Sequence, residues 1–245
     1  MGDPESAGVN PDDARTPAGD EPNSPTPDAH RDLGRLFALM GEAEKAEACG
    51  RAATAAARQA AVFPLLVMTL EQQAISALRL SDLGGALQAA SEAVAVVEPG
   101  RMYDGMRAGA LAIRARCRLA SGDVEGAERD LATCKPVLLD RDVSPMFAGS
   151  HSRAAGWWEV AAGIRAHQGD LAGAVEAWTE AVKRRRHNAS LEHVSGPYTL
   201  ATLARTLRHL GEALDAAGKP EEGKTALAEA QNIWCELGLP EQAMR

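Results

Sequence analysis

The sequence predicts an all-α protein built from five consecutive helical hairpins, and three observations support this fold class. Alanine makes up 49 of the 245 residues, whereas aromatic residues make up only 4%. Alanine has the highest helix propensity and strands favour β-branched and aromatic side chains, so this composition disfavours a large sheet. Short turn signals also recur along the chain, and small residues recur at fixed distances from those turns.

Five short turns define the expected hairpins. The turn residues are Gly41, Ser81, Gly122, Gly169 and Gly218. Glycine suits the left-handed position that ends a helix, and the Asp that follows three of these residues suits the start of the next helix. Longer breaks begin near residues 98, 140 and 187 and separate successive hairpins. The expected hairpins span residues 30–60, 63–97, 101–139, 146–186 and 197–237.

Small residues occupy the same three positions in every hairpin: seven before, five after and twelve after the turn residue. The fifteen residues are Gly34, Ala74, Ala115, Ala162 and Gly211, then Ala46, Ala86, Ala127, Ala174 and Gly223, and finally Ala53, Ala93, Cys134, Ala181 and Ala230. Helices that cross closely leave no room for a long side chain at the contact. The pattern therefore predicts closely packed helix pairs.

Residues 1–29 are predicted to form a disordered, acidic, proline-rich tail ahead of an ordered domain at 30–245. This segment holds six of the thirteen prolines, and seven carboxylates against Arg15 alone give it a net charge of −6. Such a composition cannot bury enough apolar surface to offset its ordering entropy. A solvated leader and a partner-binding arm both remain open for it.

The charge and hydropathy of the rest of the chain exclude several partners. The remaining 216 residues carry a net charge of only −2, without the basic excess of a dedicated nucleic-acid binder. No signal peptide is visible, and the longest apolar stretch, residues 60–70, is far shorter than the ~20 residues that span a bilayer. We expect a cytoplasmic protein that binds neither nucleic acid nor membrane. The 21 arginines against 5 lysines are typical of a GC-rich bacterial genome.

The sequence predicts no catalytic set, no metal site and therefore no cofactor. The four cysteines are too far apart for a metal knuckle or a redox pair, and we interpret them as small buried helix residues in a reducing compartment. The six histidines show no HExxH spacing, and the glycines lie at turns and helix contacts rather than in a phosphate-binding loop. A non-enzymatic protein is expected.

Residues 157–182, WWEVAAGIRAHQGDLAGAVEAWTEAV, resemble the tetratricopeptide repeat (TPR). The matching residues are Trp158, Ala162, Gly169, Ala174, Trp178 and Ala181. The resemblance extends over residues 30–237, with turn-to-turn steps of 40, 41, 47 and 49 residues in place of the family's 34, as in long-period bacterial members. It implies a right-handed α-solenoid of about five TPR-like hairpins.

The TPR resemblance implies a non-catalytic scaffold that binds a peptide or helix of a partner protein in a concave groove lined by the first helices. Projection of those helices gives the groove candidates Arg31, Arg35, Glu71, Arg79, Arg116, Glu159, His167, Arg205, Arg208, Glu212 and Asp215. An alternative is a regulatory sensor whose superhelical pitch changes with a ligand or peptide. It is favoured by residues 227–245, which resemble the last repeat of large actinobacterial transcriptional regulators.

Two further features allow alternative interpretations. The basic run 183–187 is either a set of cations favoured by the dipole at a helix C-terminus or a docking patch for an acidic partner. Trp157 and Trp158 are either core residues or part of a ligand cage, and the position of Trp158 in the repeat favours the core.

Overall fold

The computed structural model describes residues 26–97, 104–139, 149–191 and 196–239, and within these ranges it contains ten α-helices and no strand. The helices are α1 (Pro27–Leu39), α2 (Ala43–Gln59), α3 (Phe63–Arg79), α4 (Leu83–Val96), α5 (Asp104–Ala120), α6 (Val124–Leu138), α7 (Gly149–His167), α8 (Leu171–Ser190), α9 (Pro197–Ala216) and α10 (Pro220–Leu237). They pair into the five predicted hairpins, which are thereby confirmed.

The first helix begins earlier than the sequence predicts. Residues 27–29, assigned above to the tail, belong to α1 because Thr26 caps it: the Thr26 hydroxyl accepts the Ala29 amide, and Pro27 occupies the first helical position. The remainder of the predicted tail, residues 1–25, lies outside the described residues.

The five turns share one backbone geometry. The glycine turn residues have φ between 76° and 84°, and Ser81 adopts the same left-handed region with φ 60°. In every turn, the amide that follows the turn residue donates to the carbonyl five positions earlier at 2.9 Å, as from Asp123 to Arg118. This bond is the signature of the Schellman motif, so each turn residue ends its helix as predicted.

Three of the second helices start with the same Asp-x-x-Gly cap. The aspartate side chain accepts the amide of the glycine three residues later at 2.9 Å in all three. A Cβ on that glycine would lie within 2.1 Å of an aspartate oxygen, so an alanine there would require the aspartate side chain to shift. The pairs are Asp82 with Gly85, Asp123 with Gly126, and Asp170 with Gly173. The sequence analysis identified the aspartates but not their glycine partners.

All fifteen small-residue positions are buried in the structure. One close helix approach is between α9 and α10, where a Cβ on Gly223 would lie 2.9 Å from the carbonyl oxygen of Gly211. Gly223 stands where the other four hairpins have alanine. Its lack of a side chain is therefore explained by backbone contact.

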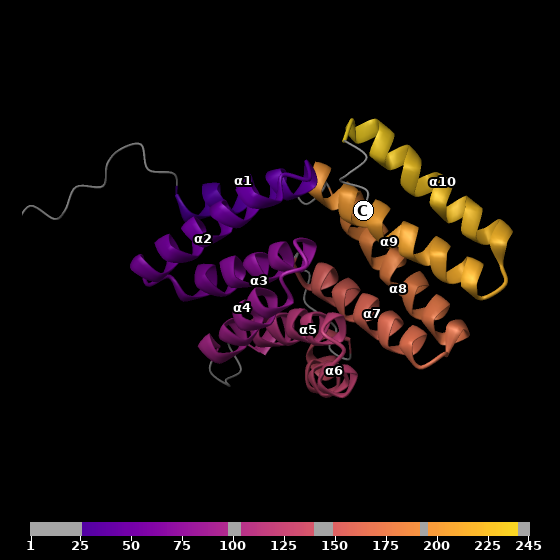
Figure 1. The fold of residues 1–245 in the computed structure, drawn as a ribbon, viewed down its shortest axis with the longest axis horizontal. Coiled ribbons are helices and arrows are strands. Elements are labelled where there is room, and N and C mark those ends of the chain that lie inside the picture. Colours follow the sequence, from indigo (N-terminus) through magenta and orange to yellow (C-terminus); the bar gives the residue numbers. More distant parts are fainter. Residues whose placement is uncertain (1–25, 98–103, 140–148, 192–195, 240–245) are drawn as a thin grey trace, which may run out of the picture.

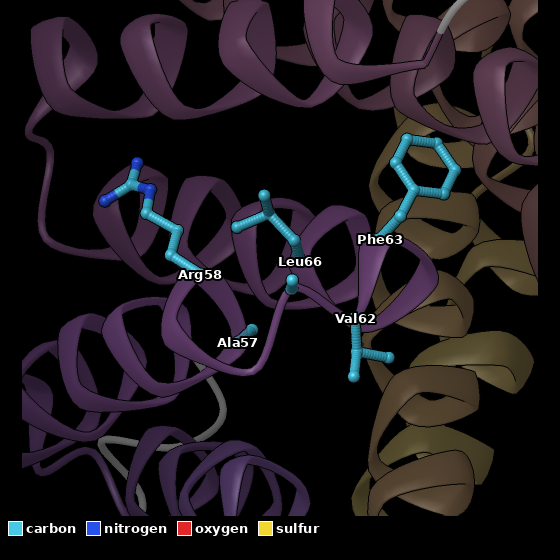
Figure 2. A pocket seen from close by; sticks show the side chains of 6 residues that line it. Ala57, Arg58, Val62, Phe63 and Leu66 are labelled. Atoms are coloured by element: carbon cyan, nitrogen blue, oxygen red, sulfur yellow. The ribbon is translucent and has the colours of Figure 1, made fainter. Parts of the chain in front are cut away.

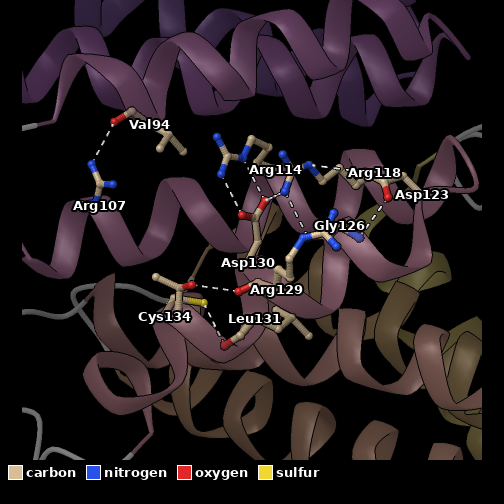
Figure 3. Close-up of polar contacts among 11 residues, drawn as sticks. Val94, Arg107, Arg114, Arg118, Asp123, Gly126, Arg129, Asp130, Leu131 and Cys134 are labelled. Atoms are coloured by element: carbon tan, nitrogen blue, oxygen red, sulfur yellow. Dashed lines mark hydrogen bonds and ion pairs between the residues drawn. The ribbon is translucent and has the colours of Figure 1, made fainter.

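A buried ion network holds the third hairpin together. Asp130 of α6 is 4% exposed and accepts two hydrogen bonds from Arg114 of α5, at 2.7 and 2.8 Å (Figure 3). Arg118, one turn further along α5, lies 2.9 Å from Asp130 and also donates to the carbonyl of Gly126. Because both arginines reach one buried carboxylate, α5 and α6 are joined by charge as well as by packing.

The hairpins stack in order, and the first returns to the fifth. Each hairpin packs against the next, and α1 also packs against α9 (Figure 1). The Arg35 guanidinium lies over the Tyr198 ring, 5.2 Å from its centroid, and Leu39 belongs to a core cluster otherwise formed by α8, α9 and α10. The superhelix therefore curls round until its first helix contacts its ninth.

The core is dominated by small residues, with few large side chains. Trp234 of α10 is 2% exposed, whereas Trp158, expected in the core, is only half-buried and packs edge to face against Trp157. Cys117 and Cys134 are buried as predicted, and burial raises the pKa of their thiols to about 11 and about 12. Cys235 is exposed, so the same prediction is wrong for it.

None of the ten described helices is both long enough and apolar enough to cross a bilayer.

Candidate functional site

A cavity of about 680 Å³ lies at the centre of the superhelix. Its wall is formed by the first helices of all five hairpins, α1, α3, α5, α7 and α9, together with the end of α8. Its volume falls within the range of about 300–1,000 Å³ that is usual for ligand-binding pockets. The inner helices therefore enclose a site of useful size, which we call the central cavity.

Five of the eleven predicted groove residues line the central cavity, and six do not. Those in the lining are Arg35, Glu71, Arg79, Arg116 and Arg205. Glu159 is buried among its neighbours, and Arg31 pairs with Asp28 near the start of α1. The remaining four, on α7 and α9, lie outside the lining: His167, Arg208, Glu212 and Asp215.

The lining is rich in arginine. The lining contains six arginines but only two acidic residues, and four of the six arginines form ion pairs. Arg35 pairs with Asp32 at 3.4 Å, and Arg153 pairs with Glu71 at 3.5 Å. Neither Arg153 nor Arg185 was predicted as a groove residue. Arg153 lies in the first turns of α7, and Arg185 lies on a second helix, whereas the prediction considered only first helices.

Glu159 is the electrostatic centre beside the cavity. Its carboxylate accepts hydrogen bonds from Arg185 at 2.9 Å and from Thr206 at 3.0 Å, and it pairs with Arg116. Burial alone would raise the pKa of Glu159, but the charges of Arg185 and Arg116 and the hydrogen bonds lower it to about 2. One carboxylate therefore connects α7 with α5, α8 and α9.

Several polar atoms that line the cavity have no partner among the described residues. Nη1 of Arg79, Oε1 of Glu71 and Oδ1 of Asn188 are buried and make no hydrogen bond there. Burial raises the pKa of Glu71, while the charges of Arg153 and Arg35 partly oppose that effect. Buried polar atoms in native proteins are nearly always paired, so these three atoms are exceptions among the residues that line the cavity.

Comparisons with known proteins were made for the sequence and for the fold. No family model matches the chain, and no curated protein matches its sequence. Among solved structures, BtubC (BKLC) from P. vanneervenii is similar with a TM-score of 0.55 and 18% identity, covering 86% of this chain and 80% of BtubC. A Rap protein complexed with Competence and Sporulation Factor is similar with a TM-score of 0.56 and 14% identity, covering 88% of this chain and 65% of Rap.

The stacked hairpins and these matches decide the fold. The chain has a TPR-type helical repeat fold. The right-handed α-solenoid of five TPR-like hairpins predicted from the sequence is confirmed. A putative kinesin light chain with TPR-like repeats is also similar, with a TM-score of 0.47, 18% identity, and coverage of 86% of this chain and 95% of that one.

The basic run 183–187 is spread around α8 of the TPR-type solenoid. Lys183 pairs with Glu180 at 3.4 Å, and Arg186 pairs with Glu229 of α10 at 2.6 Å. Arg185, in contrast, is buried and pairs with the buried Glu159. Arg185 is therefore not available on the surface for docking, whereas Lys183 and Arg186 remain exposed.

Two of the predicted residues that lie off the cavity, Arg208 and Glu212, pair on the surface of α9. Arg208 lies 3.4 Å from Glu212, and Nδ1 of His209 lies 3.1 Å from the same carboxylate. The His209 ring stacks on Trp178 of α8, and burial, followed by the charge of Arg208, lowers the pKa of His209. These contacts join α8 to α9 outside the central cavity.

A second, smaller pocket of about 200 Å³ lies at the α2–α3 turn (Figure 2). It is lined mainly by apolar side chains, including Val62, Phe63 and Leu66. No group of three or more metal-ligating side chains occurs in the parts of the chain that the structure describes. The central cavity is therefore the larger and more polar candidate site.

Proposed function

We propose that this TPR-type protein is a non-catalytic interaction module that holds a peptide or helix of a partner protein in its central cavity. The single observation that carries the proposal is that all five inner helices contribute to one cavity of about 680 Å³. The walls are already fixed by buried alanines and by the ion pairs of Glu159. A preorganised site loses little conformational entropy on binding, which favours affinity.

The unpaired acceptors in the wall suit a peptide ligand. A polypeptide carries one N–H donor on each residue except proline, and Glu71 and Asn188 each present a buried oxygen without a donor. The similar Rap protein was solved in complex with Competence and Sporulation Factor, which supports ligand binding by such a fold. The cytoplasmic location and the lack of nucleic-acid or membrane binding, expected from the sequence, remain part of this proposal.

A regulatory sensor is a second candidate, favoured by the contact between α1 and α9. Arg35 lines the cavity and also lies over Tyr198, so a ligand that moves Arg35 would weaken this contact. The superhelix would then open. A ligand-dependent increase in the radius of gyration, measured by small-angle scattering, would support the sensor. An unchanged radius of gyration with bound ligand would contradict the sensor and support the rigid interaction module.

Peptide binding can be tested with a side chain that fills the cavity. Gly156 of α7 lines the cavity, and a Cβ there would meet no atom within 4 Å, so Gly156→Phe is expected to fold and to occupy the site. Peptides selected from a random display library on the full chain should lose binding to Gly156→Phe in fluorescence anisotropy. Gly105→Phe is the control, because Gly105 is also open but lies outside the cavity.

Two outcomes would contradict the proposal. If the selected peptides bound Gly156→Phe as tightly as the wild-type chain, the central cavity would not be their site. If no peptide were enriched on the folded wild-type chain, peptide binding itself would be refuted.

A further inference from the structure

We propose that Arg79, Arg116 and Arg205 form a binding site for an oxyanion, a phosphate or a carboxylate, within the central cavity. The inference rests on the proposed function, since it names the chemical group by which the bound molecule is recognised. The three arginines come from α3, α5 and α9 and all line the cavity. We call these three residues the arginine triad.

Two members of the arginine triad have no carboxylate partner. Neither Arg79 nor Arg205 forms an ion pair with an acidic side chain of the described residues, and Nη1 of Arg79 is buried without any acceptor. Burial lowers the pKa of Arg205, and the nearby charges of Arg79 and Arg116 lower it further, while Tyr198 and Glu159 partly oppose the shift. Like charges held together away from water are costly, and a bound anion would offset that cost.

The third member, Arg116, is only partly neutralised. It pairs with Glu159, but Glu159 also pairs with Arg185, so one carboxylate serves two guanidinium groups. The Arg116 side chain remains 34% exposed and lines the cavity, which leaves further N–H donors free for a ligand. The triad is therefore left with excess positive charge.

The chemistry of guanidinium defines the ligand. Its planar array of N–H donors matches the paired oxygens of carboxylate and phosphate, and it remains charged at neutral pH. Tyr198 lies close enough to Arg79 and Arg205 to affect the pKa of both. A phenol hydroxyl can donate to the same anion. A cationic ligand would be repelled by the triad, and a neutral ligand would leave its excess positive charge uncompensated.

The test measures the melting temperature of the full chain in sodium phosphate and in sodium glutarate, each against sodium chloride at matched ionic strength. We expect at least one of the two anions to give a saturating rise in melting temperature beyond chloride. A response to phosphate alone would identify a phosphate-bearing ligand, and a response to glutarate alone would identify a carboxylate-bearing ligand. No saturating rise with either anion would overturn the site.

Variants then locate the site. Arg79→Gln and Arg205→Gln should each weaken the apparent anion affinity about tenfold or more, because each removes charged hydrogen bonds. Without anion, both variants should melt at or above the wild-type temperature, since an unpaired buried charge has been removed. Arg129→Gln is the matched control, because the Arg129 side chain is 69% exposed on α6, and it should keep the full response. A full response in Arg205→Gln would also refute the site.

The anion test can fail independently of the proposed function. If library-selected peptides bind the wild-type chain but neither anion gives a saturating rise in melting temperature, the interaction module stands and the arginine triad does not. If the anions saturate the triad but no peptide binds, the anion site stands and the peptide-binding proposal is refuted.

Discussion

At the scale of single residues, Glu159 shows how the fold uses a charge on its inner face. The sequence analysis placed Glu159 in the partner-binding groove because it lies on an inner helix. In the structure its carboxylate is 7% exposed and is occupied by Arg116, Arg185 and Thr206. An ionised carboxylate surrounded by donors stabilises the folded state as long as it remains charged.

The low pKa of Glu159 predicts the pH dependence of its contribution to stability. A glutamate pKa of about 4.5 in the unfolded chain and about 2 in the folded chain corresponds to roughly 3 kcal/mol. Because the folded pKa is the lower one, this stabilisation is complete above pH 4.5 and is lost as pH falls through 2. Glu159→Gln should therefore cost about 3–5 kcal/mol at pH 7, where it leaves Arg116 and Arg185 unpaired.

Urea denaturation of the wild-type chain and Glu159→Gln between pH 7 and pH 2 checks this prediction. The difference in unfolding free energy between the two chains should shrink steadily below pH 4.5. Other carboxylates titrate equally in both chains and cancel in that difference. A difference that stayed constant down to pH 2 would show that Glu159 is not held ionised by these partners.

At the scale of the helices, the distance between two backbones is set by a few small residues. The approach of α9 to α10 at Gly211 and Gly223 leaves no space for a methyl group on either helix. In the three aspartate-capped helices, the glycine at the third helical position lies against the aspartate oxygen, in the space that a Cβ would take. Glycine therefore marks close contact in this chain as well as turns.

A pair of glycine-to-alanine variants separates these roles. Gly223→Ala should lower the free energy of unfolding by about 1–3 kcal/mol, because its Cβ would lie 2.9 Å from a carbonyl oxygen of α9. Gly156→Ala should raise it by about 0.5–1 kcal/mol, because Gly156 lies inside α7 and its Cβ would meet no atom within 4 Å. Thermal and urea denaturation measure both. An equal effect of the two variants would mean that helix propensity, not close packing, determines the change in the free energy of unfolding.

At the scale of the whole molecule, the contact between α1 and α9 encloses the central cavity. Leu39 of α1 is 2% exposed and belongs to the core cluster of α8, α9 and α10, whereas Leu36, one turn earlier, is 50% exposed. The hairpins are otherwise connected mainly to their sequence neighbours. This contact joins helices that are far apart in the sequence.

Truncation of Leu39 tests the contact between α1 and α9. Leu39→Ala should cost about 2–5 kcal/mol and expose the α1 amides to hydrogen exchange, because a buried side chain is lost at the junction. Leu36→Ala should change stability by no more than about 0.5 kcal/mol, because Leu36 is half-exposed on the same helix. Equal exchange of the α1 amides in both variants would show that Leu39 does not hold this junction.

Local signals in the amino-acid sequence are sufficient to specify the hairpins. Glycine or serine at the turn residue, aspartate after it and fifteen small residues at constant spacing predict where helices end and where they touch. These features depend on backbone conformation and on side-chain size, which are properties of short segments. Even Ser81, which lacks the freedom of glycine, adopts the left-handed turn conformation that its position predicts.

Which inner charges are paired and which remain without a carboxylate depends on how the helices pack in three dimensions. Projection onto helix faces treats Glu159 and Arg205 alike, yet one is buried in ion pairs and the other faces the cavity without a carboxylate. The difference arises because Arg185, on a second helix, reaches inward to Glu159. The return of α1 to α9 depends on the superhelical pitch, which results from the small rotations between successive hairpins. No local sequence pattern encodes the sum of those rotations.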